Sequence, residues 1–140
     1  KKSTDSLTIG PMYPMAQFVV NLLSESGNRF LKVAVDLELS DVKLQPEMDK
    51  KKSLIRDLII RTFSSKTFEE ISTLKGKDKL KEEVLEKNNS SLSDGQVKNI
   101  YFTDFAPVIV VFHVHLRQNG SVALRPNGSL QTPIQIFVVR

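Results

Sequence analysis

Two histidines in the last third of the chain are the residues best suited to hold a metal ion. His113 and His115 lie two positions apart in an apolar, β-branched run that predicts a strand, so both imidazoles would project from one face. Imidazole is a frequent ligand of zinc and copper. Residues 106–140 contain no Asp, Glu or Cys that could serve as a third ligand. The pattern therefore favours a solvent-facing pair, and a small ligand- or metal-binding α+β domain that uses the His113/His115 strand is the alternative function.

Carboxylates are the other groups that could do acid–base chemistry. Asp36, Asp94 and Asp104 lie in different predicted strands and turns, and no pattern pairs any of them with a second carboxylate. The chain has no cysteine, which excludes thiolate nucleophiles, disulfides and cysteine-based zinc sites. It also lacks a nucleophile elbow, a phosphate-binding glycine loop and a metal-binding helix motif. We therefore expect no enzyme activity, no cofactor and no metal.

The overall charge is mildly basic, with a formal net charge of +4 at pH 7 and a pI of about 9.4. Nucleic-acid binding would require Lys and Arg residues to gather on one face with stacking aromatic residues nearby. Here they are interleaved with Asp and Glu, and Lys50, Lys51 and Lys52 would fan across about 200° of a helix. We therefore expect no nucleic-acid partner.

Hydrophobic periodicity defines the elements that would position these residues. Residues 30–39 alternate between apolar and polar side chains, which is typical of a half-buried antiparallel strand. Apolar residues recur at helical spacing between Leu54 and Phe63. The sequence therefore predicts an α+β fold with a small antiparallel sheet covered on one face by helices. The predicted strands are 18–22, 30–39 and 97–105, and the predicted helices are 46–64, 68–73 and 77–88.

Composition divides the chain into three parts. Residues 1–15 are polar and turn-like, with Pro11 and Pro14, and predict an extended tether. Residues 16–105 form the predicted domain, and residues 106–140 are a β-rich extension with Asn-Gly turns. No apolar run is long enough to span a membrane. Because the chain begins at Lys1 without Met, we expect it to be a piece of a longer protein, from which a leader or an anchor before the tether has been left out.

Several short segments occur in a characteristic order along the domain. They are Tyr13-Pro14 ahead of residues 18–22, Arg29-Phe30-Leu31-Lys32-Val33, Ile55-Arg56-Asp57, Ser64-Ser65-Lys66-Thr67-Phe68, Gly76-Lys77 with Leu80, and Val97 through Tyr101-Phe102-Thr103-Asp104-Phe105. Together they cover about residues 11–105. In this order and spacing they resemble the periplasmic domain of the FliL family of flagellar basal-body-associated proteins.

The resemblance implies a non-enzymatic protein with one inner-membrane helix and a C-terminal domain in the periplasm. It implies a fold like that of stomatin and prohibitin (SPFH) domains, and self-assembly into a ring. The ring would surround the periplasmic linker of the peptidoglycan-anchoring subunit of the flagellar stator, and would support stator engagement and torque for motility. Residues 106–140 depart from the family's usual length. We interpret them as a lineage-specific or vector-derived extension that could add strands to a sheet edge.

Charged residues on the two long predicted helices are candidates for the contact between subunits. Residues of opposite sign on both helices could pair across a head-to-tail contact, which closes into a ring when the rotation permits. A solvated helix face, or a local cap for the first two residues, is the alternative interpretation. The candidates are Arg56, Asp57 and Arg61 on the first helix, and Lys79, Glu82 and Glu86 on the second.

Overall fold

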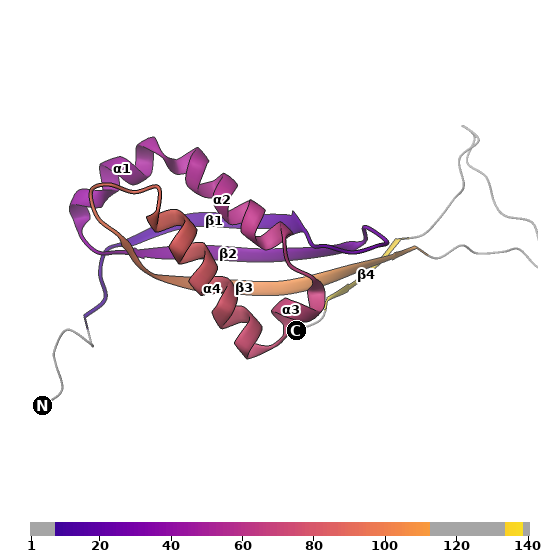
Figure 1. Ribbon diagram of the computed structural model, residues 1–140. Coiled ribbons are helices and arrows are strands. Elements are labelled where there is room, and N and C mark those ends of the chain that lie inside the picture. Colours follow the sequence, from indigo (N-terminus) through magenta and orange to yellow (C-terminus); the bar gives the residue numbers. More distant parts are fainter. Residues whose placement is uncertain (1–7, 113–133, 139–140) are drawn as a thin grey trace, which may run out of the picture.

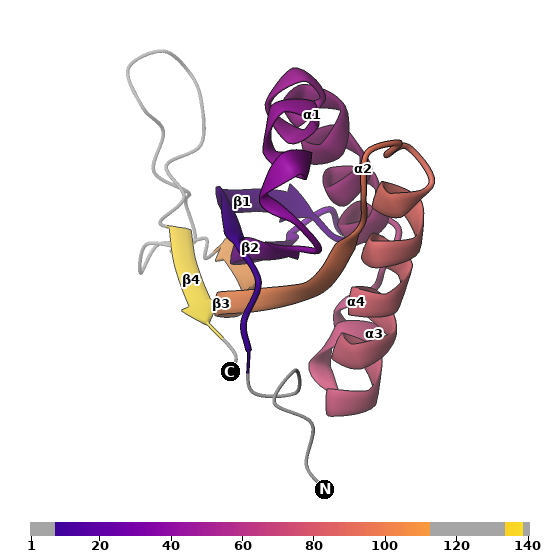
Figure 2. The same ribbon diagram turned by 90° about the vertical axis from the view of Figure 1, so that its left-hand side faces the viewer.

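Four antiparallel strands form one sheet, and the helices that the structure describes lie on one face of it (Figures 1 and 2). The computed structural model describes residues 8–112 and 134–138. The strands follow the order β1-β2-β3-β4 across the sheet. This arrangement confirms the predicted α+β class and adds a fourth strand to the three predicted. The strands are β1 (Met12–Asn21), β2 (Arg29–Leu39), β3 (Val97–Phe112) and β4 (Ile134–Val138).

The helical layer follows β2 directly in the chain. It begins with a short 3-10 helix and ends with the helix that leads into β3. The helix α2 buries Ile55, Ile59 and Phe63, which recur one turn apart, and α4 buries Leu80 and Val84 in the same way. Each helix therefore presents an apolar stripe to the sheet. The elements are η2 (Val42–Leu44), α1 (Gln45–Lys50), α2 (Lys52–Ser64), α3 (Phe68–Ser72) and α4 (Leu74–Asn89).

The central strand β2 supplies the middle of the core. Every second residue of β2 is fully buried against the helices. These residues are Leu31, Val33, Val35, Leu37 and Leu39. Burial of each such side chain stabilises the fold by about 1.5–3 kcal/mol. The side chains between them face the other side of the sheet, as the alternating sequence predicts.

The helix boundaries differ from the sequence prediction at two points. The single helix predicted over 46–64 is interrupted at Lys51, which has φ −100° and ψ 12° and separates α1 from α2. The helix predicted to begin at 77 begins at Leu74, because the Thr73 side chain accepts a hydrogen bond from the Gly76 N–H and caps the first turn.

The strands are longer than predicted. The first begins at Met12, so the last residues of the expected tether belong to β1, where Tyr13 and Met15 enter the core. Pro14 is tolerated because β1 is an edge strand, where a residue whose N–H would point away from the sheet can lack that donor. Strand β3 continues to Phe112, so the division predicted near residue 106 falls inside a strand.

The tail adds β4 along the far end of β3. Residues 134–138 of the predicted β-rich extension pair antiparallel with residues 108–112, so this part of the extension joins the sheet as a strand. His113, His115 and the Asn-Gly turns of the extension lie outside the described residues. Within residues 8–112 and 134–138, no helix combines the length and the apolar character needed to cross a bilayer.

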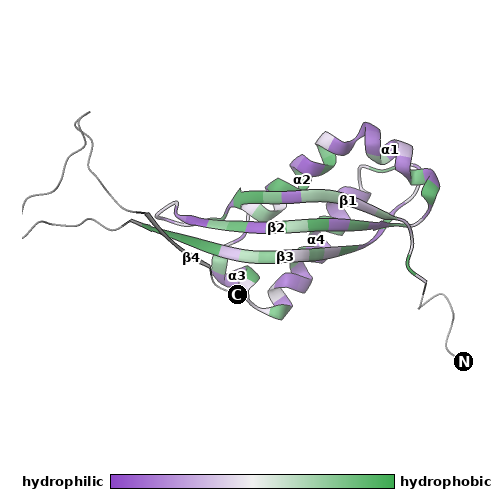
Figure 3. Cartoon of the chain, turned by 180° about the vertical axis from the view of Figure 1, so that it is seen from behind, coloured by the Kyte–Doolittle hydropathy of each residue, from purple (hydrophilic) through white to green (hydrophobic). Residues whose placement is uncertain are grey.

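Figure 3 views the sheet from the side opposite the helices, and its strands contain both hydrophilic and hydrophobic residues. Polar and apolar side chains alternate across neighbouring strands, for example where Val19 lies opposite Lys32 and Lys32 lies opposite Ala106. Val19 is 66% exposed, and Lys32 is also exposed. This face is therefore not a second apolar core.

Candidate functional site

The outward surface of α2 and α4 is the candidate site, because it carries the residues predicted to join subunits. On α2, the Asp57 carboxylate accepts a salt bridge from Arg61 at 3.0 Å, one helical turn away. Both side chains are more than half exposed, so this pair contributes little to stability. Asp57 and Arg61 therefore remain accessible to a second molecule.

Arg56 differs from its neighbours because its guanidinium group contacts strand β1 of its own chain. Ala16 has a positive φ of 63°, and the pairing of β1 with β2 shifts register there. This bulge turns backbone carbonyls toward α2. Arg56 donates hydrogen bonds to the carbonyl oxygens of Met15 and Gln17, the second at 3.3 Å. Its guanidinium also lies 4.1 Å from the centre of the Phe18 ring, a cation–π distance.

We expect Arg56→Ala to lower the free energy of unfolding by about 1–2 kcal/mol, since two hydrogen bonds and a ring contact are lost. Urea denaturation followed by circular dichroism measures the change. Arg61→Ala is the matched control on the same helix, and we expect it to change stability by less than about 0.5 kcal/mol. Equal effects of the two substitutions would show that Arg56 does not hold the β1 bulge.

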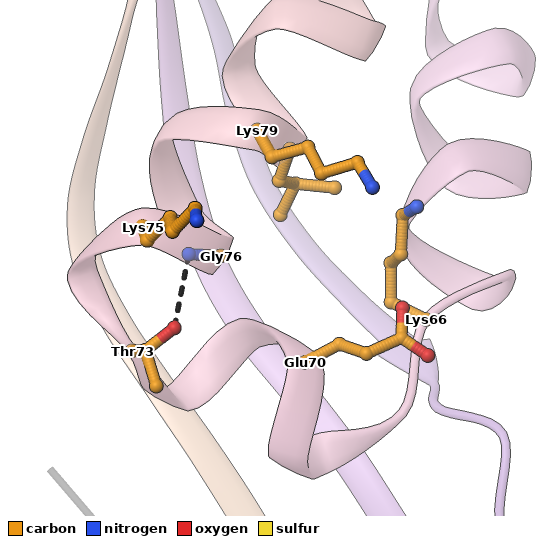
Figure 4. Close-up of a pocket in the computed structure, with 7 residues that line it drawn as sticks. Lys66, Glu70, Thr73, Lys75, Gly76 and Lys79 are labelled. Atoms are coloured by element: carbon orange, nitrogen blue, oxygen red, sulfur yellow. Dashed lines mark hydrogen bonds between the residues drawn. The ribbon is translucent and has the colours of Figure 1, made fainter.

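The α4 candidates lie on a different part of the surface from those on α2. Lys79, Glu82 and Glu86 are all exposed. Lys79 lines a hollow of about 300 Å³ at the start of α4, together with residues of α3 and of the loop before it. Figure 4 shows Lys79 extending from α4 toward Lys66, and Glu70 reaching over from α3. The hollow is lined by Lys66, Glu70, Thr73, Lys75, Gly76, Lys79 and Leu80.

An ion pair closes one side of this hollow. The Lys66 ammonium lies 2.8 Å from Glu83 of α4, and both side chains are mostly buried. The hydrogen bond from Lys66 holds the pKa of the Glu83 carboxyl below its ordinary value. Lys66 is thus occupied within its own chain.

Two buried acids elsewhere owe their shifted pKa values to structural roles. A hydrogen bond from Lys51, followed by one from the Asp94 N–H, lowers the pKa of Glu47 to about 2. The backbone N–H of Gly10, then the Tyr101 hydroxyl, lower the pKa of Glu38. The Glu47 carboxylate ties the loop before β3 to α1, and the Glu38 carboxylate ties the N-terminal segment to β2, so each shift has a structural cause.

Tyr13 is a third buried group with a shifted pKa. Burial, and then its hydrogen bond to Asp49, raise the pKa of Tyr13 to about 12. No group of three or more potential metal-ligating side chains occurs in the described part of the chain.

The sequence interpretation did not predict the side-chain contacts that three lysines make within the chain. Lys66 binds Glu83, and Lys77 and Lys81 lie over the rings of Phe105 and Phe102. The four-residue spacing of Lys77 and Lys81 places them on one helix face, a signal that was present in the sequence. The rings beneath them could not be identified without the sheet register.

The chain is similar to flagellar proteins along most of the described domain. The family model described as "Flagellar basal body-associated protein FliL" matches residues 12–106. A protein of Aquifex aeolicus named "Flagellar protein FliL" is 41% identical over 98 residues, covering 69% of this chain and 61% of that protein. A Bacillus subtilis protein of the same name is 29% identical over 105 residues, covering 75% of this chain and 72% of its own length.

These matches coincide with the structure, because residues 12–106 begin at the first residue of β1 and include the helical layer. They confirm the resemblance found in the sequence. The chain belongs to the FliL family of flagellar basal-body-associated proteins.

Proposed function

We propose that this domain is a non-enzymatic accessory part of the flagellar motor that assembles around the stator unit and supports torque generation. The observation that carries the proposal is the family match over residues 12–106. The proposed partner is the periplasmic linker of the peptidoglycan-anchoring stator subunit. The proposed location is the periplasm, with an inner-membrane helix preceding Lys1 in the whole protein.

The attachment of the N-terminal segment to the sheet supports the proposed location, in which a membrane helix precedes this domain. The Gly10 N–H donates to Glu38 at 2.9 Å, and the Leu39 N–H donates to the Pro11 carbonyl at 2.8 Å. A side chain on Gly10 would meet the Leu39 carbonyl oxygen at 2.4 Å, so the segment lies tightly against β2. A membrane helix upstream would thus be joined to the sheet at a fixed point. The helices on one sheet face are consistent with the proposed SPFH-like fold.

The exposed charges on α2 and α4 support assembly into a ring. Arg61 and Asp57 offer both signs on α2, and Lys79, Glu82 and Glu86 offer both on α4. A head-to-tail contact could join the α2 surface of one subunit to the α4 surface of the next. Arg56 contributes less to such a contact, because its guanidinium group is already hydrogen-bonded to β1.

Sedimentation velocity of the 1–140 chain across a concentration series tests the assembly. We expect the mean mass of the sedimenting species to rise with protein concentration. A shortened chain that ends after Phe112 should show the same rise. A monomer at every concentration up to about 1 mM would contradict self-assembly of this domain. Association that disappears with residues 113–140 would assign it to the tail.

Charge reversal then tests which surfaces meet. We expect Arg61→Glu and Glu82→Lys each to weaken association about two- to fivefold, and the double variant to recover part of the loss. Glu25→Lys, in the exposed turn between β1 and β2, is the matched control. If the double variant only adds the two losses, the two residues do not face each other.

Cross-linking in motile cells tests the partner. The chain has no cysteine, so a Glu82→Cys variant provides one defined attachment point. A photoreactive maleimide at this position should capture the stator subunit, identified by mass spectrometry. Capture of other proteins only, together with unchanged swimming speed in cells that lack the protein, would contradict the proposed function.

A further inference from the structure

The free edge of β1 is unsuited to accept another strand. Pro14 has no N–H to donate, and Arg56 already binds the carbonyls of Met15 and Gln17. Beyond the end of β1, the Leu23 N–H donates to the Lys66 carbonyl at 2.9 Å. Strand addition to this sheet must therefore use the opposite side.

The opposite side is the outer edge of β3, and β4 covers only part of it. Strand β4 pairs with residues 108–112, whereas no strand in the described part of the chain pairs with the outer edge of residues 98–104. These residues form an uncovered length of edge that we call the β3 edge. An uncovered edge exposes backbone donors and acceptors that can bind an extended peptide.

The register shows which backbone groups of the β3 edge point outward. The Val110 N–H donates to Asn28 of the β1–β2 turn, so alternate residues of β3 bond toward β2. After the bulge near Asp104, the residues opposite Ala34 and Asp36 are Thr103 and Tyr101. The N–H and C=O of Phe102 and the C=O of Ile100 therefore face outward. The Ile100 N–H donates a hydrogen bond to the side-chain oxygen of Asn99. A carbonyl group of a bound strand could take the place of this side-chain acceptor.

Two lysines of α4 lie over aromatic rings of β3, one over Phe102 in the β3 edge and one over Phe105 just beyond it. The Phe102 and Phe105 rings stack with centroids 5.5 Å apart. The Lys81 ammonium lies 5.3 Å from the centre of the Phe102 ring, and the Lys77 ammonium lies 4.9 Å from that of Phe105. Figures 1 and 2 show the N-terminal half of α4 and α3 extending past β3 on this side.

The net charge beside the β3 edge is positive. Lys98 is exposed on the strand itself, and Lys77 and Lys81 project from α4. Asp104 is the exposed carboxylate at the far end of the edge. A strand bound here would be favoured by a carboxylate at every second residue, on the face that meets α4, because the two lysine ammonium groups lie over the phenylalanine rings on that same face.

We infer that the β3 edge binds an extended, acidic segment of another protein as an additional antiparallel strand. No segment of this chain has the required chemistry: residues 106–140 contain no Asp or Glu, and residues 1–11 contain one, Asp5. The charged strand β2 is internal to the sheet. The inference adds a binding mode to the proposed function and holds whether or not the domain forms a ring.

The test is an NMR titration of the isotope-labelled 1–140 chain with a synthetic peptide in which Glu and Val alternate for about eight residues. We expect shift changes across the β3 edge and slowed solvent exchange of the Phe102 amide. The control peptide has the same sequence with N-methyl groups on every second amide, which preserves charge but removes strand pairing. Equal binding of both peptides, or no binding of the first, would overturn the inference.

Charge variants test the choice of an acidic partner. We expect Lys77→Glu with Lys81→Glu to weaken binding of the Glu-Val peptide about tenfold, because two exposed ion pairs are lost. Lys75→Glu with Lys79→Glu, on the same helix, is the matched control and should change affinity less. Protection of the Phe102 amide that rises with protein concentration without peptide would instead assign the edge to a second copy of the chain, and would overturn the choice of partner.

Discussion

Gly76→Ala is expected to lower the free energy of unfolding by about 3 kcal/mol or more, although alanine is the better helix former. Gly76 lies in the first turn of α4, where exchange of glycine for alanine ordinarily stabilises a helix by up to about 1 kcal/mol. Here an added methyl group would lie 1.7 Å from the carbonyl oxygen of Glu70 and 2.9 Å from its carbonyl carbon. Both are backbone atoms, which cannot rotate away as a side chain could.

The consequence is a forced separation of α3 from α4. The Gly76 N–H also donates to Thr73 at 3.0 Å, so a shift of the helix start weakens the cap as well. Urea denaturation measures the loss, and Gly27→Ala is the control. Gly27 has a positive φ of 66° but no atom within 4 Å of the added methyl, so its cost is limited to backbone strain of about 1–2 kcal/mol. A Gly76→Ala protein as stable as the parent would show that Glu70 does not approach this helix so closely.

The central strand and the apolar faces of the helices were predictable from local pattern alone. The alternation of residues 30–39 predicts that Val33, Val35 and Leu37 are buried, as they are in the structure. Successive side chains of a strand point to opposite faces, so only the apolar set can face the core. The break at Lys51 was not predictable, since no Gly or Pro marks it. In the structure the Lys51 ammonium donates to Glu47 and to the Ser91 carbonyl, a contact 40 residues away in sequence.

Strand β1 shows how a correct local rule can mislead. Pro11 and Pro14 favoured a tether because each proline fixes its own φ and pushes the preceding residue into an extended conformation. At an edge, however, alternate residues point their N–H away from the sheet, and Pro14 occupies such a position. Only knowledge of which neighbour β1 pairs with could have identified it as an edge strand.

The candidate site was predictable as a set of residues but not as a set of contacts. Arg56 has the same helical context as Arg61 in the sequence, yet it binds carbonyls 39 and 41 positions earlier. The difference arises from the bulge at Ala16. Its positive φ would normally be expected at a glycine, so the alanine gave no indication of a bulge in the sequence. The subunit contact itself stays a prediction.

The second large effect is expected at Glu47, whose carboxylate joins α1 to the loop between α4 and β3. It accepts hydrogen bonds from the Ser93 N–H at 2.9 Å, the Asp94 N–H at 2.8 Å and the Lys51 ammonium at 2.7 Å. The side chain is 7% exposed. Glu47→Gln retains the shape of the side chain but replaces one accepting oxygen with an amide group that donates. The charge-assisted hydrogen bonds to that oxygen are lost, and Lys51 is left without its counter-ion. We expect the thermal midpoint to fall by roughly 5–10 °C. Glu86→Gln, exposed on α4, is the control and should leave it unchanged.

The pH dependence of this loss separates the charge of Glu47 from its shape. The native-state pKa is about 2, below the ordinary value of 4.5, so the native state binds fewer protons than the unfolded state between these values. The stabilisation from Glu47 is therefore complete above about pH 5 and disappears as the pH falls toward 2. The other acids with lowered pKa values, such as Glu38 and Glu83, are present in both proteins and cancel in the comparison. The gap between the parent and Glu47→Gln should thus narrow as the pH is lowered from 6 to about 2. A gap that stays constant over this range would assign the effect to packing instead of to the carboxylate charge.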